Sequence, residues 1–204
     1  MRIVLASGNT GKIREIQALL LPRNIQVLPQ SAFAIAEAEE TAPTFLENAL
    51  LKARNASKYS GLPALADDSG LEVDALNGAP GIYSARYAGS QAGAQANNMK
   101  LLEALEGFDS DQRRARFRCV LVYLRHPFDP APLITQGVWE GIIAKTLQGE
   151  GGFGYDPLFY LPELGKTAAE LSPEEKNRLS HRGKALRQLL ELLPEAAPSN
   201  QEGY

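Results

Sequence analysis

A glycine-rich segment near the N-terminus has the composition of a phosphate-binding turn. It lies between a short apolar run and a helical pattern, and it reads Ser7, Gly8, Asn9, Thr10, Gly11, Lys12. A turn that enters a helix presents free backbone N–H groups and the positive end of the helix dipole, which suit phosphate oxygens. It is not a Walker A loop, because two residues rather than four separate Gly8 from Gly11. The competing interpretation is an ordinary helix start, with Asn9 as the N-cap and Lys12 in solvent.

Acidic residues gather at two places, and one of them, the end of a strand, could hold a hard cation. Glu37, Glu39 and Glu40 precede a predicted helix, and Asp67 and Asp68 stand at the end of an apolar run. Mg²⁺ prefers carboxylate oxygens and keeps several waters, so two acids at a strand end fit it. Since adjacent side chains on a strand point to opposite faces, the two aspartates are expected to do different work. The alternatives are solvated acids ahead of a helix and an Asx turn in a hairpin.

The loop at residues 149–157, GEGGFGYDP, could bind a flat ring. Its glycines do not form a dinucleotide fingerprint, because no strand–helix unit follows and a proline intervenes at once. Phe153 and Tyr155, on either side of Gly154, could stack on a base while Asp156 accepts hydrogen bonds from its edge. The alternative is a tight, packed turn.

Basic and polar side chains at helical spacing form two further candidate surfaces. Asn48, Lys52 and Asn55 share one face of a predicted helix, so Lys52 points into either a cleft or solvent. A second group stands in the last predicted helix, where Asn177 and His181 are four positions apart, and its members are Lys176, Asn177, His181, Arg182 and Lys184. The competing interpretation of such residues is a solvated helix face.

The elements that must position these residues alternate between strand and helix patterns, which indicates an α/β or α+β fold. Strands are predicted at 2–6, 25–28, 64–67, 71–76 and 116–124, with a hairpin turn at 68–70 and two more strands within 133–144. Helices are predicted at 10–21, 45–59, 95–105 and from 172 to about 193, with N-terminal caps at Thr44 and Ser172. An exposed strand edge or a dimer surface is predicted for Arg113, Arg114, Arg116 and Arg118.

Composition limits the class of protein. The chain has 204 residues, with Lys+Arg 21 against Asp+Glu 24 and a formal net charge of −3. Proteins that bind nucleic acid usually carry a basic excess, so we expect no nucleic-acid partner. Cys119 is the single cysteine, which predicts no internal disulfide and fits a reducing, cytoplasmic compartment. No apolar stretch has the length of a signal peptide or a membrane span, so we expect no membrane association.

Taken together, the segments resemble the inosine triphosphate pyrophosphatase family, also called non-canonical purine NTP pyrophosphatases or XTP/dITP diphosphatases. From residue 3 to about residue 190, the resemblance is carried by ASGNTGKIREI, TFLENALLKA, ALADDSGLEVDALNGAPGIYSARYAG, GGFGYDPLF and KTAAELSPEEKNRLSHRGKAL. It implies an α/β fold in which a long twisted mixed sheet with flanking helices spans two lobes, with the nucleotide in the cleft between them. We therefore expect one two-lobed domain over residues 1–193 and a polar, disordered tail at 194–204.

The resemblance also implies an activity. Such enzymes use Mg²⁺ to hydrolyse ITP, dITP and XTP to the monophosphate and pyrophosphate, which clears deaminated purines from the nucleotide pool. It further implies a homodimer. The alternatives are a related pyrophosphatase that acts on modified pyrimidine or standard nucleoside triphosphates, and a nucleotide-binding regulator without catalysis.

Site roles carry over by the same resemblance. Asp68 would be the general base and a Mg²⁺ ligand, and Glu40, or in its place Glu39, would be the second acidic ligand. Lys12 and Lys52 would contact the triphosphate and shield the leaving pyrophosphate, together with the loop residues Ser7, Gly8, Asn9, Thr10 and Gly11. The remaining substrate contacts would be Ser69, Phe153, Gly154, Tyr155, Asp156, Lys176, His181 and Arg182, the last two reading the purine 6-oxo group.

Overall fold

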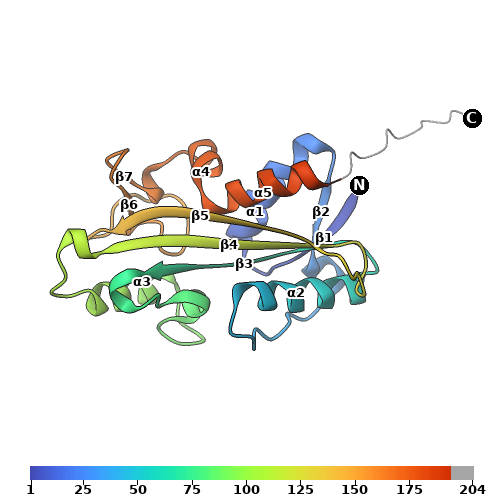
Figure 1. The fold of residues 1–204 in the computed structure, drawn as a ribbon, viewed down its shortest axis with the longest axis horizontal. Coiled ribbons are helices and arrows are strands. Elements are labelled where there is room, and N and C mark those ends of the chain that lie inside the picture. The colour runs from blue at the N-terminus through green and yellow to red at the C-terminus, as the bar shows by residue number, and fades with distance from the viewer. Residues whose placement is uncertain (194–204) are drawn as a thin grey trace, which may run out of the picture.

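Seven strands form one mixed sheet with helices on both sides (Figure 1). The computed structural model describes residues 1–193, so the predicted tail at 194–204 lies outside the described residues. The strands are β1 (Arg2–Ala6), β2 (Gln26–Pro29), β3 (Ala64–Val73), β4 (Arg114–Leu124), β5 (Leu133–Ile143), β6 (Phe159–Leu161) and β7 (Lys166–Thr167). The helices are α1 (Thr10–Leu20), α2 (Phe45–Ser60), α3 (Ala94–Ala104), α4 (Pro173–Leu179) and α5 (His181–Leu192). Within residues 1–193, no helix has the length and apolar character that a membrane span requires.

The strand order β2-β1-β3-β4-β5-β6-β7 leaves part of one strand edge without a neighbouring strand. β1 runs parallel to β2 and β3, and the pairs from β3 onward are antiparallel. β3 pairs with β4 over its whole length but with β1 only as far as Ala6 and Ala66. From Asp67 onward, the edge of β3 therefore faces the loop that follows β1. The carboxyl ends of parallel strands are the usual place for a ligand in an α/β sheet.

Apolar clusters fix the helices to the sheet. α1 and α5 pack on one side of the sheet and α2 on the other, as Figure 1 shows. Leu189 of α5 meets Leu121 of β4 in the first cluster, and small residues such as Ala53 let α2 lie close to the strands. A third cluster joins Leu101 of α3 to Trp139 at the other end of the sheet. Mixed sheet and flanking helices confirm the predicted α/β class.

The predicted hairpin at 68–70 is wrong, because β3 passes straight through Asp68, Ser69 and Gly70. These residue types favour turns, but here each has a partner on β4 and the ladder is unbroken. Gly70 serves a close approach instead: a Cβ at this position would lie 2.3 Å from the carbonyl oxygen of Gly81.

The two strands predicted within 133–144 are one strand, β5. Its glycines mark close contacts rather than a break. A Cβ at Gly137 would lie 1.9 Å from the carbonyl oxygen of His181, and one at Gly141 would meet the ring of Phe159. The absence of a side chain at Gly137 therefore lets the start of α5 rest on the sheet.

The single helix predicted from 172 to about 193 is also wrong, since Ser180 divides it into α4 and α5. The predicted cap at Ser172 is confirmed, and Ser180 is a second N-cap whose Oγ accepts from Gly183 N at 3.1 Å. The predicted shared face of Asn177 and His181 does not exist as a result. His181 and Arg182 instead occupy the first turn of α5.

The arginines at the start of β4 do not form an exposed edge, because β4 lies between β3 and β5. Arg116 contacts Asp74 at 2.6 Å, and Arg118 contacts Glu72 at 2.6 Å, so both pair with acids of the neighbouring segments. Arg113 is buried and donates to two backbone carbonyl oxygens. The charges of Arg116 and Arg118 are therefore balanced by acids of β3 and of the turn that follows it.

Candidate active site

A cavity of about 860 Å³ lies beside the uncovered edge of β3. It joins the loop after β1, the loop before β6 and the α4–α5 junction, which are distant in sequence. Predicted substrate contacts that line it are Gly8, Asn9, Thr10, Gly11, Lys12, Ser69, Phe153, Gly154, Tyr155, Asp156, Lys176, His181 and Arg182. Predicted site residues outside the lining are Ser7, Glu40, Lys52 and Asp68. The structure thus brings most of the predicted substrate contacts together around one cavity. The predicted metal-binding acids Glu40 and Asp68, and Lys52, lie outside its lining.

The loop after β1 is both a helix cap and a wall of the cavity. The side chain of Asn9 accepts from the backbone N–H of Gly11 at 2.9 Å and of Lys12 at 3.1 Å, so the predicted N-cap is correct. Gly11 is pressed against the other wall, because a Cβ there would come within 2.6 Å of the Phe153 ring. Lys12 does not point into solvent, however: its ammonium pairs with Asp67. The same turn therefore caps α1 and aims a lysine at β3.

Asp67 is the central acid of the cavity side of β3. The sequence pattern offered it, together with Asp68, as a possible Mg²⁺ ligand, but in the structure its partners are cations of the chain itself. Its carboxylate accepts from Lys12, from Arg182 Nε at 2.8 Å and from Ser69 Oγ at 2.8 Å. The thiol of Cys119 also donates to it, at 3.2 Å. Burial alone would raise the pKa of Asp67, but the two cations hold it well below its ordinary value. Asp67 is therefore a buried anion that fixes Lys12 and Arg182.

Glu15 plays the same part for Lys176 and for the other side of the Arg182 guanidinium, and the sequence interpretation did not single it out. Its carboxylate pairs with Lys176 Nζ at 2.9 Å and with the guanidinium of Arg182. Lys176 Nζ also donates to Asp156 at 2.5 Å and lies 4.4 Å from the centre of the Phe153 ring. The only sequence signal for a site role of Glu15 was its position one turn after Lys12 on α1, and a glutamate exposed on the surface would show the same spacing.

His181 is held flat against an aromatic wall. Its ring stacks on Phe117 with centroids 4.8 Å apart and an angle of 13° between the planes. Burial, followed by the nearby Arg182 charge, lowers its pKa well below the ordinary value, so the ring is neutral at pH 7. Its Nδ1 is buried without a hydrogen-bond partner among the described residues. Since buried polar atoms are usually paired, an unpaired nitrogen beside an open cavity is suited to a ligand.

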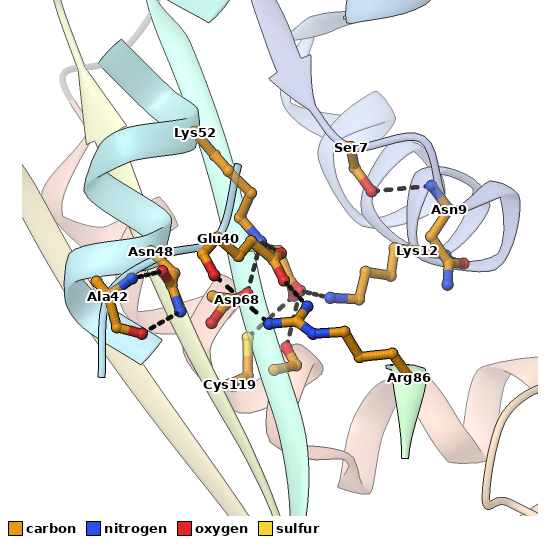
Figure 2. A network of polar contacts seen from close by, with 12 residues as sticks. Ser7, Asn9, Lys12, Glu40, Ala42, Asn48, Lys52, Asp68, Arg86 and Cys119 are labelled. Carbon is orange, nitrogen blue, oxygen red and sulfur yellow. Dashed lines mark hydrogen bonds and ion pairs between the residues drawn. The ribbon is translucent and has the colours of Figure 1, made fainter. Parts of the chain in front are cut away.

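A second polar cluster, the acid cluster, lies on the α2 side of β3 and contains Asp68, Lys52, Glu40 and Arg86 (Figure 2). Lys52 Nζ lies 2.5 Å from Asp68 Oδ1 and 2.8 Å from Glu40 Oε1. The other oxygen of Glu40 accepts from Arg86 at 2.7 Å. Glu39 is exposed and has no polar side-chain contact within the described part of the chain, so the geometry favours Glu40 as the acid paired with Asp68.

The two acids of this cluster have opposite pKa shifts. Burial raises the pKa of Asp68 to about 6, against the opposing charges of Lys52 and Lys12. Burial also disfavours charge on Glu40, but Lys52 and Arg86 lower its pKa to about 2. A carboxyl with a pKa near 6 can both accept and hold a proton near neutral pH, which suits a general base.

Donor chemistry at the acid cluster fits a hard divalent cation. Glu40 and Asp68 both face the position of a single ammonium, so oxygens of both could face one cation. Within residues 1–193 no third histidine, cysteine or acid joins them to complete a protein-only metal cage. Mg²⁺ usually takes one or two carboxylates and completes its shell with water and phosphate oxygens, so a two-acid site is sufficient.

Two consecutive residues of β3 connect the cavity with the acid cluster. Asp67 and Asp68 point to opposite faces of the sheet, and the edge of β3 beside them has no strand neighbour. The charge of Lys12, which pairs with Asp67, also lowers the pKa of Asp68, so the cavity and the acid cluster interact. A ligand lying along this edge can reach both.

Comparison with known proteins agrees with this arrangement. The sequence model of the Ham1 family matches residues 3–192. The chain belongs to the Ham1 family. A relative from Thioalkalivibrio sulfidiphilus named dITP/XTP pyrophosphatase is 65% identical, over 95% of this chain and 98% of the relative. The protein of the same name from Escherichia coli K12 is 56% identical, over 94% and 98%.

A solved Ham1 structure has the same fold. The HAM1 protein from Coxiella burnetii superposes with a TM-score of 0.88 at 54% identity, covering 96% of this chain and all of that one. The family resemblance predicted from the motifs is therefore confirmed over nearly the full length.

Proposed function

We propose that this protein hydrolyses non-canonical purine nucleoside triphosphates, namely dITP, ITP and XTP, to the monophosphate and pyrophosphate with Mg²⁺. The observation that carries the proposal is the 65% identity, over nearly the whole of both chains, to a relative named dITP/XTP pyrophosphatase. The cavity beside β3 supplies a site with matching chemistry at each end.

Cationic donors at the β1 end support binding of the triphosphate. The ammonium of Lys12 has three N–H donors and one is used by Asp67, so two remain for phosphate oxygens. The loop also lies at the N-terminus of α1, where backbone N–H groups favour anions. We assign Ser7, Gly8, Asn9, Thr10 and Gly11 to this subsite with Lys12, and Lys52 contributes from the α2 side.

The far end of the cavity supports recognition of a purine with a 6-oxo group. Phe153 lines the cavity and is the ring that we assign to stack on the base, and Asp156 accepts from the Phe153 N–H at 2.7 Å, which holds the loop in place. Arg182 has five N–H donors, of which three contact Asp67, Glu15 and Ser69, so two remain.

Discrimination follows from the donors that would be left unpaired. A 6-oxo oxygen accepts from Arg182 or His181, whereas the 6-amino group of adenine is itself a donor. Leaving one buried donor unpaired costs about 1–3 kcal/mol, which is roughly ten- to a hundredfold in kcat/KM. We therefore expect ATP to be a poor substrate.

Asp68 is the proposed general base. With a pKa near 6 it is largely ionised at pH 7 and can take a proton from the water that attacks the α-phosphorus. Bound Mg²⁺ would supply a more acidic water and neutralise phosphate charge, and Glu40 and Asp68 would hold it. Lys12 and Lys52 would shield the charge that develops on the leaving pyrophosphate.

Product analysis tests the proposal. Purified protein is incubated with ITP, XTP, dITP, GTP, ATP and dUTP, with and without Mg²⁺, and the products are separated by anion exchange. We expect IMP and pyrophosphate from ITP only when Mg²⁺ is present. A rate on ATP or dUTP equal to that on ITP would refute the proposed specificity, and release of inorganic phosphate would refute the bond assignment. Light scattering of the same sample tests the predicted homodimer.

A further inference from the structure

The carboxylates of the acid cluster already hold a cation that belongs to the chain. Lys52 Nζ bridges Asp68 Oδ1 at 2.5 Å and Glu40 Oε1 at 2.8 Å, as Figure 2 shows. The Lys52 side chain is 13% exposed and that of Asp68 is 8% exposed, so solvent screens the group poorly. Because both carboxylates face this single ammonium, a divalent cation bound between them would need the position that Lys52 Nζ occupies.

The loop that carries Glu40 is fastened to α2 on both sides of that residue. Asn48 is fully buried, and its amide accepts from Ala42 N at 3.0 Å and donates to Ala42 O at 3.1 Å. About two turns further along the same face of α2, Asn55 donates to Ala36 O at 2.9 Å. These bonds matter because residues 35–41 have no regular secondary structure of their own.

The remaining partners are also fixed, apart from Lys52. Asp68 lies within a strand, and the second oxygen of Glu40 is held by Arg86. Lys52 reaches the carboxylates through a flexible four-carbon side chain, and nothing else in the described residues accepts from its ammonium. Lys52 is the group that bridges the two carboxylates, and it can leave them without moving the backbone while Arg86 still holds the second oxygen of Glu40.

We propose that Lys52 is an internal counter-ion, which holds Glu40 and Asp68 together in the metal-free protein and is displaced when a divalent cation binds them. This inference rests on the proposed function, because it takes the acid cluster as the metal site. Without Lys52 the two carboxylates would repel each other, so its charge keeps the site assembled. The same charge competes with the metal and weakens metal binding in the absence of nucleotide.

Once a divalent cation has displaced Lys52 from the carboxylates, its ammonium is free to bind the phosphates of the nucleotide. Phosphate oxygens offer Lys52 new acceptors, so nucleotide removes the competitor and tightens metal binding. By thermodynamic reciprocity, the metal tightens nucleotide binding by the same factor. Lys52 thus couples occupancy of the acid cluster to occupancy of the cavity.

Titration with Mn²⁺ in the absence of nucleotide tests the competition, with free Mn²⁺ followed by electron paramagnetic resonance. The full-length wild type is compared with Lys52→Gln, Glu40→Gln and the control Lys58→Gln, which lies on the exposed face of α2. Charge-assisted hydrogen bonds in a partly buried site predict roughly tenfold tighter binding for Lys52→Gln. We expect Lys58→Gln to equal wild type and Glu40→Gln to bind more weakly. Lys52→Gln that binds no more tightly than wild type, while Glu40→Gln binds more weakly, overturns this inference alone.

A second measurement on the wild type covers the case in which Lys52→Gln does not fold. Acetylation of lysines by a water-soluble activated acetyl ester, which transfers its acetyl group to the amine and releases the alcohol component of the ester, is followed by mass spectrometry with and without saturating Mn²⁺. Displacement predicts several-fold faster acetylation of Lys52 with Mn²⁺ and an unchanged rate at Lys58. Equal or slower acetylation of Lys52 overturns the inference. Mn²⁺ binding that Glu40→Gln leaves unchanged overturns it together with the proposed metal site, whereas the product analysis on ITP tests the proposed reaction separately.

Discussion

Neighbouring acids on β3 should respond in opposite ways to the same substitution. Asp67→Asn removes a buried anion that two cations need, whereas Asp68→Asn removes a charge that its surroundings disfavour. The pKa of Asp67 lies well below its ordinary value and that of Asp68 is raised to about 6. We therefore expect Asp67→Asn to destabilise the protein strongly, and Asp68→Asn to abolish turnover without loss of stability.

The structure sets the size of each effect. Asp67→Asn leaves Lys12 and the buried Arg182 without their shared carboxylate, and removing one partner of a buried ion pair typically costs about 3–5 kcal/mol. For Asp68, each unit of raised pKa corresponds to about 1.4 kcal/mol of disfavoured charge. Asp68→Asn should therefore stabilise the protein by up to about 3 kcal/mol at pH 7, because the net pKa already includes the attraction of Lys52, and Glu40 still pairs with Lys52 in the variant.

Urea denaturation followed by circular dichroism measures both variants between pH 4 and 8. Because the pKa of folded Asp68 lies above its unfolded value of 3.8, the wild type should lose stability as the pH rises from about 4 to about 6. That component should vanish in Asp68→Asn. The Asp67 contribution is lost only as the pH falls through its depressed pKa, so it persists over this whole range. The reasoning is refuted if Asp67→Asn costs less than about 1 kcal/mol, or if both variants lose equal stability.

Three other predictions concern the base end and the metal. Gly137→Ala should lose about 1–3 kcal/mol and raise KM for ITP, because the new Cβ would lie 1.9 Å from the His181 carbonyl oxygen. Gly93→Ala has open space and is the control in the same urea and kinetic assays. Ser180→Ala and Ser172→Ala should each cost about 1 kcal/mol as lost caps, but only Ser180→Ala should raise KM. Chelation by EDTA should stop pyrophosphate release, measured by a coupled assay, while Tm in thermal melts stays within a few degrees because Lys52 compensates the acids.

Local chemistry made the helix starts predictable. Asn9, Thr44 and Ser172 each cap a helix through their own side chain, and the signal lies within four residues of the cap. The glycine-rich turn and the loop at 149–157 were singled out by their composition, but only the family resemblance assigned them to one cleft, and the structure places most of these residues around one cavity. Glu15, which was missed, and Asp67, whose partners were missed, both act through residues distant in the chain. Asp67 meets Arg182 across 115 positions, and nothing near either residue reveals the pair.

Glycines and turn-forming residues misled the strand prediction for a physical reason. Gly70 and Gly137 have no Cβ because another backbone lies where it would be, and this packing is invisible in a local pattern. Similarly, Ser180 ends one helix and begins the next, although the apolar spacing continues across it. The spacing of apolar residues indicates which face of a helix is buried, but it does not show where one helix ends and another begins within the same run.

Continuity of β3 through Asp67 and Asp68 is what allows two environments to meet at one point. In a strand, consecutive carboxylates must point to opposite faces, so Asp67 can be buried among cations while Asp68 keeps a raised pKa beside Glu40 and Lys52. A hairpin turn at 68–70 would take Asp68 out of the strand and would no longer require the two acids to point to opposite faces. Because β1 ends at Ala6, the same stretch is open along its edge, and a ligand there can contact both faces at once. The strand therefore gives the two acids different surroundings on opposite faces. Because no strand pairs with this edge, one bound nucleotide could contact both faces.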